Sequence, residues 1–253
     1  MRTVRSLPLG TAGVLGAFIA ALAGCSTAPT GPLSAAQIAD IHKGVSTALI
    51  PLMLAANKRW LNGTVTLDLV IDRDNQLLSC KGTRMEGAPE LVPVVEQACW
   101  ATVLPSLPPE AFRADGKAKL RTPVSVRMNH DGNPTQRAYF EAVVFPMFAQ
   151  NQYFWDHGIS RVAFRSVGEA GFRYVADHEG RVLACTAKIT ANEARKEAFK
   201  QNPQLVANLQ KACLGMNLAK MPGFLVADNG LAAGTVWTTY APWRKAAPRF
   251  EGQ

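Results

Sequence analysis

A pair of cysteines stands in the same sequence surroundings twice along this chain of 253 residues. The first block reads VTLDLVIDRDNQLLSCKG and then PELVPVVEQAC; the second reads GFRYVADHEGRVLACTAK and then PQLVANLQKAC. A shift of 105 positions lays Cys80 on Cys185, and a shift of 114 lays Cys99 on Cys213. The difference is a nine-residue insertion of helical composition around 190–199. Because self-similarity at a long period is typical of a duplicated structural unit, we expect a tandem repeat of one small domain.

Each block predicts a β-hairpin followed by a helix. Apolar and polar residues alternate over 65–71, which is the period of a half-buried strand. Turn-forming residues at 72–75 and a returning strand at 76–81 complete the hairpin. A helix is expected at 89–100, and the second block predicts the same order.

A helical segment with an internal proline precedes each hairpin. Residues 35–57 are helical in pattern and are expected to break near Pro51, to which Pro146 corresponds in the second block. The last strands are expected at 119–128 and 235–240. Each unit is then helix, β-hairpin, helix, β-strand: an α+β fold with a small antiparallel sheet covered by helices on one face. The predicted domains are a first repeat over 35–132 and a second over 133–253, divided at the turn-rich segment 130–134.

Helical periodicity brings each cysteine pair together. Leu91, Val95 and Cys99 recur every four residues and form one stripe of the predicted helix. That stripe is expected to face the hairpin, where Cys80 points to the same side. The second unit repeats this spacing. The predicted disulfides are Cys80–Cys99 and Cys185–Cys213.

Residues 1–24 predict a lipoprotein signal peptide. Arg2 and Arg5 precede an apolar run of about sixteen residues, which is shorter than the roughly 20 that a membrane-spanning helix needs. The run ends in the sequence LAGC at Cys25, which resembles the bacterial lipobox. The resemblance implies that Cys25 is lipidated and becomes the N-terminus after cleavage. An ordinary signal peptide that leaves Cys25 as a free thiol is the alternative.

The residues after Cys25 indicate where the protein is held. In the sorting rule of such lipoproteins an aspartate next to the cysteine retains the protein at the inner membrane, so Ser26 favours the periplasmic face of the outer membrane. Residues 25–34 predict a short tether. The chain has five cysteines, an odd number for an exported protein. Lipid on Cys25 leaves four, which matches two disulfides in an oxidising compartment.

Composition describes an ordinary globular protein, with 48% apolar and 18% charged residues. The net charge of +8 would raise nucleic acid as a partner in a cytosolic protein. Export argues against nucleic acid here. The remaining interpretations are attraction to anionic lipid or another envelope polyanion, and a solvated basic surface.

The order of elements resembles a known family. The sequences NGTV at 62–65, IDRD at 71–74, GAPEL at 87–91 and LPP at 107–109 are similar to the C-terminal domain of TonB-type proteins. In the second repeat DHEG at 177–180 and the following helix carry the resemblance. It implies a hairpin, a helix and a final strand, a non-enzymatic role, and a partner bound at the exposed sheet edge. The predicted tether lacks the long Pro-rich span of a TonB transducer, so energy transduction is not implied.

No pattern in the sequence predicts catalysis, a metal or a cofactor. The four histidines lie apart, without the spacing of a metal motif: His42, His130, His157 and His178. Asp156 and His157, with Ser160 nearby, are the only stretch with triad residue types, and a triad depends on geometry more than on sequence. A metal site of the four paired cysteines and a calcium site at the hairpin acids are weaker alternatives than disulfides and turns.

The sequence favours a lipid-anchored protein of the bacterial cell envelope that acts as a non-enzymatic protein-binding or scaffolding module. One alternative is an immunity or inhibitor lipoprotein directed against a periplasmic toxin or hydrolase. Another is an envelope hydrolase with an unrecognised site. The expected partners are a membrane, through the N-terminal lipid, and an envelope protein.

The last strand of the second repeat is the expected binding edge. Pro123 in the first repeat lacks an N–H group, and Lys119, Arg121 and Arg127 discourage strand pairing. The second repeat has no such residues there, and offers two aromatic residues for contact unless 242–253 folds over the strand. The expected binding residues are Thr235, Val236, Trp237, Thr238, Thr239 and Tyr240.

Overall fold

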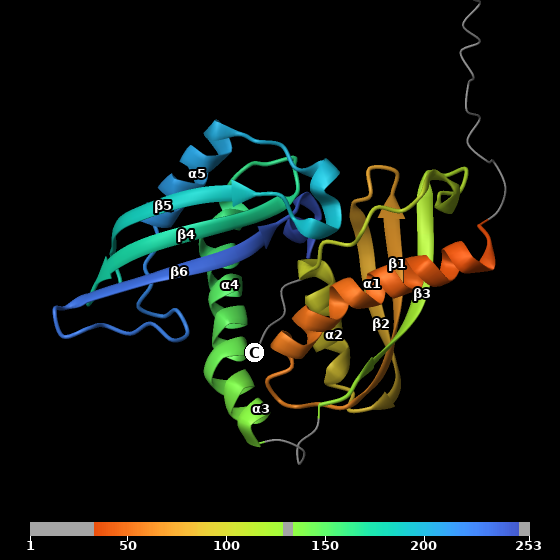
Figure 1. Cartoon of the computed structure of the whole chain (residues 1–253), viewed down its shortest axis with the longest axis horizontal. Helices are drawn as coiled ribbons and strands as arrows, with labels where there is room; N and C mark the ends of the chain where they lie inside the picture. Colours follow the sequence, from red (N-terminus) through yellow and green to blue (C-terminus); the bar gives the residue numbers. More distant parts are fainter. Residues whose placement is uncertain (1–32, 129–133, 248–253) are drawn as a thin grey trace, which may run out of the picture. The chain divides into compact units, whose positions relative to one another are not determined.

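The computed structural model describes residues 33–128 and 134–247. The predicted signal peptide, Cys25, most of the tether and His130 lie outside the described residues, as does most of the predicted domain boundary. The fold is α+β, with two three-stranded antiparallel sheets (Figure 1). The segment Pro32–Gln253 forms one compact unit.

The first sheet contains β1 (Gly63–Asp72), β2 (Leu77–Gly87) and β3 (Lys117–Val126), in the order β2-β1-β3. Alternate residues of β1 are buried, as the period-2 pattern predicts. The central strand pairs antiparallel with both neighbours (Figure 1). Both β2 and β3 are therefore edge strands of this sheet.

Helix α1 (Ala35–Ala56) begins with a capping box between Ser34 and Gln37 and ends before Asn57. The predicted break at Pro51 is wrong, because the helix continues through this residue. Pro51 removes one main-chain hydrogen bond, the one that Thr47 would accept. Both residues are exposed, so water can satisfy that carbonyl and the helix need not end.

By length and composition α1 is the one helix among the described residues that could cross a membrane, a property shared by core helices of soluble proteins. Val45, Leu49 and Met53 on one side of α1 are buried in the first core. The predicted helix at 89–100 is confirmed as α2 (Leu91–Ala101), which contacts both α1 and β2.

The second sheet contains β4 (Gly168–Asp177), β5 (Val182–Thr190) and β6 (Leu231–Tyr240), in the order β5-β4-β6. The pairing of β4 with β6 repeats that of β1 with β3: Gly63 faces Val126, and Gly168 faces Tyr240. The last strands differ slightly from the predicted ranges, since β3 begins and ends two residues earlier and β6 begins four residues earlier. The two sheets therefore share order, direction and register.

The other helices belong mostly to the second repeat. They are α3 (Pro134–Tyr139), a π-helical turn η2 (Phe140–Val144), α4 (Phe145–His157) and α5 (Pro203–Leu214). Short 3₁₀ helices are η1 (Pro109–Ala111), η3 (Ile159–Arg161), η4 (Glu193–Ala198) and η5 (Pro242–Ala246). The insertion at 190–199 thus contains η4. Pro146 lies in the first turn of α4, directly after the π-helical turn η2.

Each sheet has its own apolar core, but the first core also takes in side chains from the second repeat, among them Phe145 and Trp243. Arg195 of η4 adds a polar contact to this packing. Its guanidinium is 5% exposed and donates to the carbonyl oxygens of Asn75 (2.6 Å) and Asp74 (3.2 Å) in the turn between β1 and β2. The inserted segment therefore joins the second repeat to the first hairpin.

Candidate binding surface

The final strands β3 and β6 each lie at one edge of a sheet, with main-chain groups facing away from the central strand. Pro123 has no N–H group, so it cannot donate a hydrogen bond to β1. Trp237 holds the corresponding place in β6, where it faces Gly171 in the same register. We infer that the main-chain groups of Trp237 point away from β4.

A hydrogen bond at the end of β6 agrees with this orientation. The carbonyl oxygen of Thr239 accepts from Nη1 of Arg244 (2.6 Å), a residue outside the sheet. Main-chain groups alternate in direction along a strand, so Thr235 and Ala233 also present theirs outward. Within the described part of the chain, the N–H and C=O groups of Ala233, Thr235 and Trp237 have no hydrogen-bond partner on that side. These three residues form the open edge of β6.

The six predicted binding residues divide into two sets. Thr235, Trp237 and Thr239 point to the outer face of the sheet and are exposed or half-buried. Val236, Thr238 and Tyr240 point inward and are buried. The expectation that Tyr240 is available as an aromatic contact is wrong: its ring is fully buried, 5.4 Å from the ring of Phe164. Burial raises the pKa of the Tyr240 hydroxyl, and the neighbouring Ser166 opposes this in part.

Trp237 is the one large aromatic side chain on the outer face of β6. Its ring lies against Gly171 of β4, where an added Cβ atom would come within 2.9 Å of the ring. The ammonium group of Lys188, a residue of β5, lies 4.5 Å from the centre of the Trp237 ring. The indole thus spans all three strands of the second sheet and remains 37% exposed.

Arg244 of η5 closes the end of the β6 edge. Its buried guanidinium contacts Thr239, donates to Oγ1 of Thr238 (3.2 Å) and Oε1 of Gln152 (3.0 Å), and lies 4.2 Å from the ring centre of Trp155. Burial lowers the pKa of Arg244 to about 10, and the charge of Asp156 opposes this. Part of the segment 242–253 therefore does fold over the edge of β6. Among the described residues, Thr239 is the one whose outward main-chain carbonyl it binds. The sequence gives no local signal for this, because Gln152 is far away in the chain.

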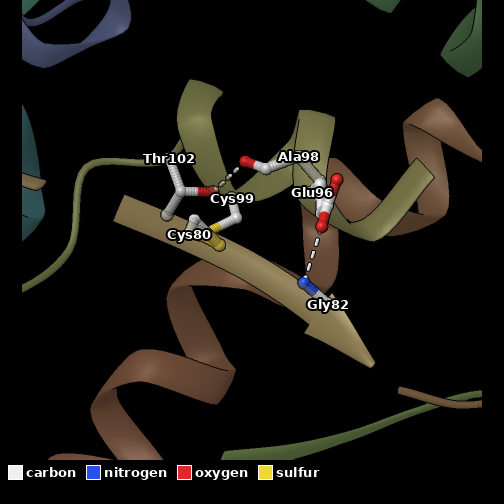
Figure 2. Close-up of a disulfide and its surroundings, with 6 residues drawn as sticks. All are labelled: Cys80, Gly82, Glu96, Ala98, Cys99 and Thr102. Carbon is white, nitrogen blue, oxygen red and sulfur yellow. Dashed lines mark hydrogen bonds between the residues drawn. A yellow bond between two sulfur atoms is a disulfide. The ribbon is translucent and has the colours of Figure 1, made fainter. Parts of the chain in front are cut away.

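The predicted disulfides are confirmed. The Sγ atoms of Cys80 and Cys99 are 2.09 Å apart and join β2 to α2, and those of Cys185 and Cys213 are 1.98 Å apart and join β5 to α5. Figure 2 shows a second link beside the first bridge, where the Gly82 N–H donates to Oε1 of Glu96 (2.6 Å). Each disulfide thus joins a helix, α2 or α5, to the edge strand β2 or β5. These strands lie at the edge of the sheet opposite the final strand.

The triad-like stretch forms no triad. Nδ1 of His157 lies 3.0 Å from the carbonyl oxygen of Tyr153, and the Ser160 hydroxyl donates to the carbonyl oxygen of Asp156 (3.3 Å). Both side chains therefore bond main-chain groups at the end of α4. Among the residues that the structure describes, no group of three His, Cys, Asp or Glu side chains could hold a metal ion.

Trp60 and Trp155, which the sequence places at equivalent positions, are both buried. Trp60 packs on the rings of Phe140 and Phe145, and Trp155 packs on Phe164. Neither is a surface platform for a ligand.

Comparison with models of protein families, with curated proteins and with solved structures finds no match to this chain.

Proposed function

We propose that this chain is a lipid-anchored protein of the bacterial cell envelope, held at the periplasmic face of the outer membrane, that binds an extended segment of a protein partner along β6. Its units would be TonB-C-like binding modules without an enzymatic activity. The observation that carries the proposal is the open edge of β6, formed by the main-chain groups of Ala233, Thr235 and Trp237.

An open edge of this kind can pair with an added strand. From Ala233 to Trp237 the edge is about 13 Å long at the usual rise of a strand. An extended partner segment of about five residues would pair its own N–H and C=O groups with this length. The lack of charge and proline in β6 leaves nothing on the strand itself to oppose such pairing.

The side chains beside the edge supply selectivity. Ala233 and Thr235 are small and exposed, whereas Trp237 is large and held in place over Gly171. Because the indole extends from β6 over β4 towards Lys188 on β5, it leans away from a strand added at the open edge. The partner would meet small side chains at Ala233 and Thr235, which favours bulky side chains opposite these two residues.

The test is site-specific crosslinking in intact envelopes. A photo-crosslinking amino acid at Thr235 is expected to give an adduct of one defined mass, and the same group at Arg121, the corresponding position of β3, is expected to give none. Trp237→Pro should abolish the adduct because it removes an outward-facing N–H, whereas Trp237→Ala keeps that N–H and should only weaken it. Equal adducts from both repeats, or an adduct that survives Trp237→Pro, would place the interface elsewhere.

The anchor is tested separately. Cys25→Ala removes the atom that would carry lipid, so the variant is expected to leave the membrane fraction or to remain as an uncleaved precursor. Detergent phase partitioning with labelled fatty acid measures this. A variant that partitions and labels like the natural protein would contradict the lipid anchor.

A further inference from the structure

A basic hollow lies on the second repeat, away from the open edge of β6. It consists of two adjoining parts of about 400 Å³ and 490 Å³ that share His157, Arg161 and Gly215. The walls come from the end of α4, from η3 and from the end of α5 with the residues that follow it. Three separate segments therefore bring their side chains to one place.

Positive charge gathers in this hollow without an opposing carboxylate. Arg161 lines both parts, Lys211 lines one and Lys220 lines the other, and neither part has an Asp or Glu in its walls. No ion pair involves these three residues within the described ranges, whereas Arg181 and Lys196 nearby in the sequence are both paired. The three cations are therefore free to bind an anion.

The histidine between the two parts has a fixed orientation. Its ring stacks on Tyr153 with the centres 4.1 Å apart, and its Nδ1 lies 3.0 Å from the Tyr153 carbonyl oxygen. A carbonyl oxygen can only accept, so Nδ1 carries the hydrogen. The Tyr153 hydroxyl in turn donates to the carbonyl oxygen of Asn217. In the neutral ring the other nitrogen of His157, Nε2, is then an acceptor, which suits a hydroxyl group of a ligand. One wall of the hollow is held in place before any ligand binds.

The first repeat lacks the equivalent charges. Asn62 stands where His157 does by the shift of 95 that lays Trp60 on Trp155, and Gln97 stands where Lys211 does by the shift of 114 that lays Cys99 on Cys213. The segment that carries Arg161 has no counterpart, because only two residues separate Trp60 from Gly63. The basic hollow is thus a property of the second repeat and does not follow from the fold they share.

We propose that this hollow binds a ligand that carries a phosphate group. The guanidinium fork of Arg161 matches the geometry of phosphate oxygens, and two lysines add point charges that suit a doubly charged anion better than a single carboxylate. Each part of the hollow is of the size that holds a small organic molecule, so the ligand has a further group attached to its phosphate. A soluble sugar phosphate and the phosphate head group of an envelope lipid share this chemistry. The inference does not depend on partner binding at β6.

The experiment uses the mature chain without its lipid, beginning at Ser26, which keeps the whole compact unit Pro32–Gln253. Calorimetric titration with glucose 6-phosphate, with glucose and acetate as controls, tests the soluble source. Co-sedimentation with vesicles that contain phosphatidic acid, compared with vesicles of phosphatidylcholine alone, tests the lipid source. Saturable binding to either phosphate-bearing probe, and to no control, is the expected result.

Matched variants separate the hollow from general surface charge. Arg161→Gln and Lys211→Gln should each weaken binding about tenfold, the size expected for one lost charge-assisted hydrogen bond. Lys200→Gln removes the same charge from an exposed site of the second repeat outside the hollow and should leave binding unchanged. Thermal unfolding of each variant checks that the fold is kept.

The pattern of results identifies the source or overturns the proposal. Binding to glucose 6-phosphate alone indicates a soluble ligand, and binding to phosphatidic acid vesicles alone indicates a lipid head group. Absence of saturable binding to both probes would overturn the proposal. Equal losses from Lys200→Gln and Lys211→Gln would also overturn it, because they would show attraction to the surface as a whole.

Discussion

The final strands β3 and β6 have the same place and register in their sheets, but their outer faces differ. In both strands every second residue points inward, and the patterns of buried and exposed residues agree at all positions but one. The outward-facing residues of β3 are Lys117, Lys119, Arg121, Pro123 and Ser125. Those of β6 are Leu231, Ala233, Thr235, Trp237 and Thr239. The inward-facing residues are buried in the core of each repeat. A difference in partner binding between β3 and β6 therefore depends on their outward-facing residues.

The ends of the two strands also differ in how they are held. In the first repeat the side chain of Asn62 bonds the main-chain N–H (2.5 Å) and carbonyl (3.2 Å) of Met128. In the second repeat Arg244 donates to the carbonyl oxygen of Thr239 and also to Oε1 of Gln152 in α4. A neutral amide and a buried cation thus complete the same sheet architecture.

The largest expected effect tests whether the two repeats depend equally on their disulfides. Replacing both cysteines of either pair by alanine is expected to lower the free energy of unfolding by about 3 kcal/mol, because the unfolded chain is no longer constrained. The sequence separations of 19 and 28 should make the two losses differ by only a few tenths of a kcal/mol. Urea unfolding measures both losses. A loss in one repeat alone would break the equivalence.

A pair of proline variants tests which main-chain groups of β6 face outward. Thr238→Pro should lower the free energy of unfolding by about 2 kcal/mol or more, because it removes an N–H that pairs with β4. Thr235→Pro should cost about 1 kcal/mol or less, since this residue is exposed, its N–H faces away from β4, and Pro123 is accommodated in the corresponding outward set of β3. The comparison is made by urea unfolding, and a reversed order of the two losses would refute the assigned orientation.

Replacing Arg244 or Asn62 tests how much each of these side chains stabilises the end of its final strand. Arg244→Ala is expected to destabilise the protein by about 2 kcal/mol, because Arg244 is buried and the oxygens of Thr238, Thr239 and Gln152 lose their donor. Asn62→Ala should cost about 1 kcal/mol, since Asn62 is exposed and water can replace part of its bonding. Arg244→Lys keeps the charge but not the planar fork and should recover only part of the loss. Equal thermal stability of Arg244→Ala and the natural protein would contradict this role.

The smallest expected effect is on acid sensitivity. A hydrogen bond from Arg181 is the largest cause of the lowered pKa of Asp177, and one from Arg121 does the same for Asp68. A carboxyl whose pKa is lowered by folding stabilises the fold above its unfolded pKa, and this contribution is lost as the pH falls through the folded pKa. Arg181→Gln and Arg121→Gln should therefore each reduce the melting temperature slightly at pH 6, by an amount that shrinks below pH 4. A difference that grows in acid would contradict the ion pairs.

Much of the fold could be predicted from the sequence because local patterns carry it. The period-2 alternation of β1 and the four-residue stripe of α2 place Cys80 opposite Cys99, and the repeat extends this to the second pair. The same alternation, applied along 235–240, would have assigned Tyr240 to the core with Val236 and Thr238.

Other features depend on contacts that no local pattern shows. The first residues of β6, Leu231–Gly234 in the sequence LAAG, have weak strand propensity and are ordered by pairing with β4. Arg244 is positioned by Gln152, and the basic hollow is assembled from three segments. The only sequence signal for the hollow is the excess of basic residues in the second repeat, which does not say where they meet.

The binding of Arg195 to the first hairpin affects whether the two repeats can be separated by cleaving the chain between them. Its bonds to Asp74 and Asn75 and the packing of Phe145 and Trp243 into the first core make the halves parts of one folding unit. Cleavage of the connection between Met128 and Pro134 should leave two fragments that remain associated. Neither half would then be an exchangeable module, because each repeat completes its packing with side chains of the other.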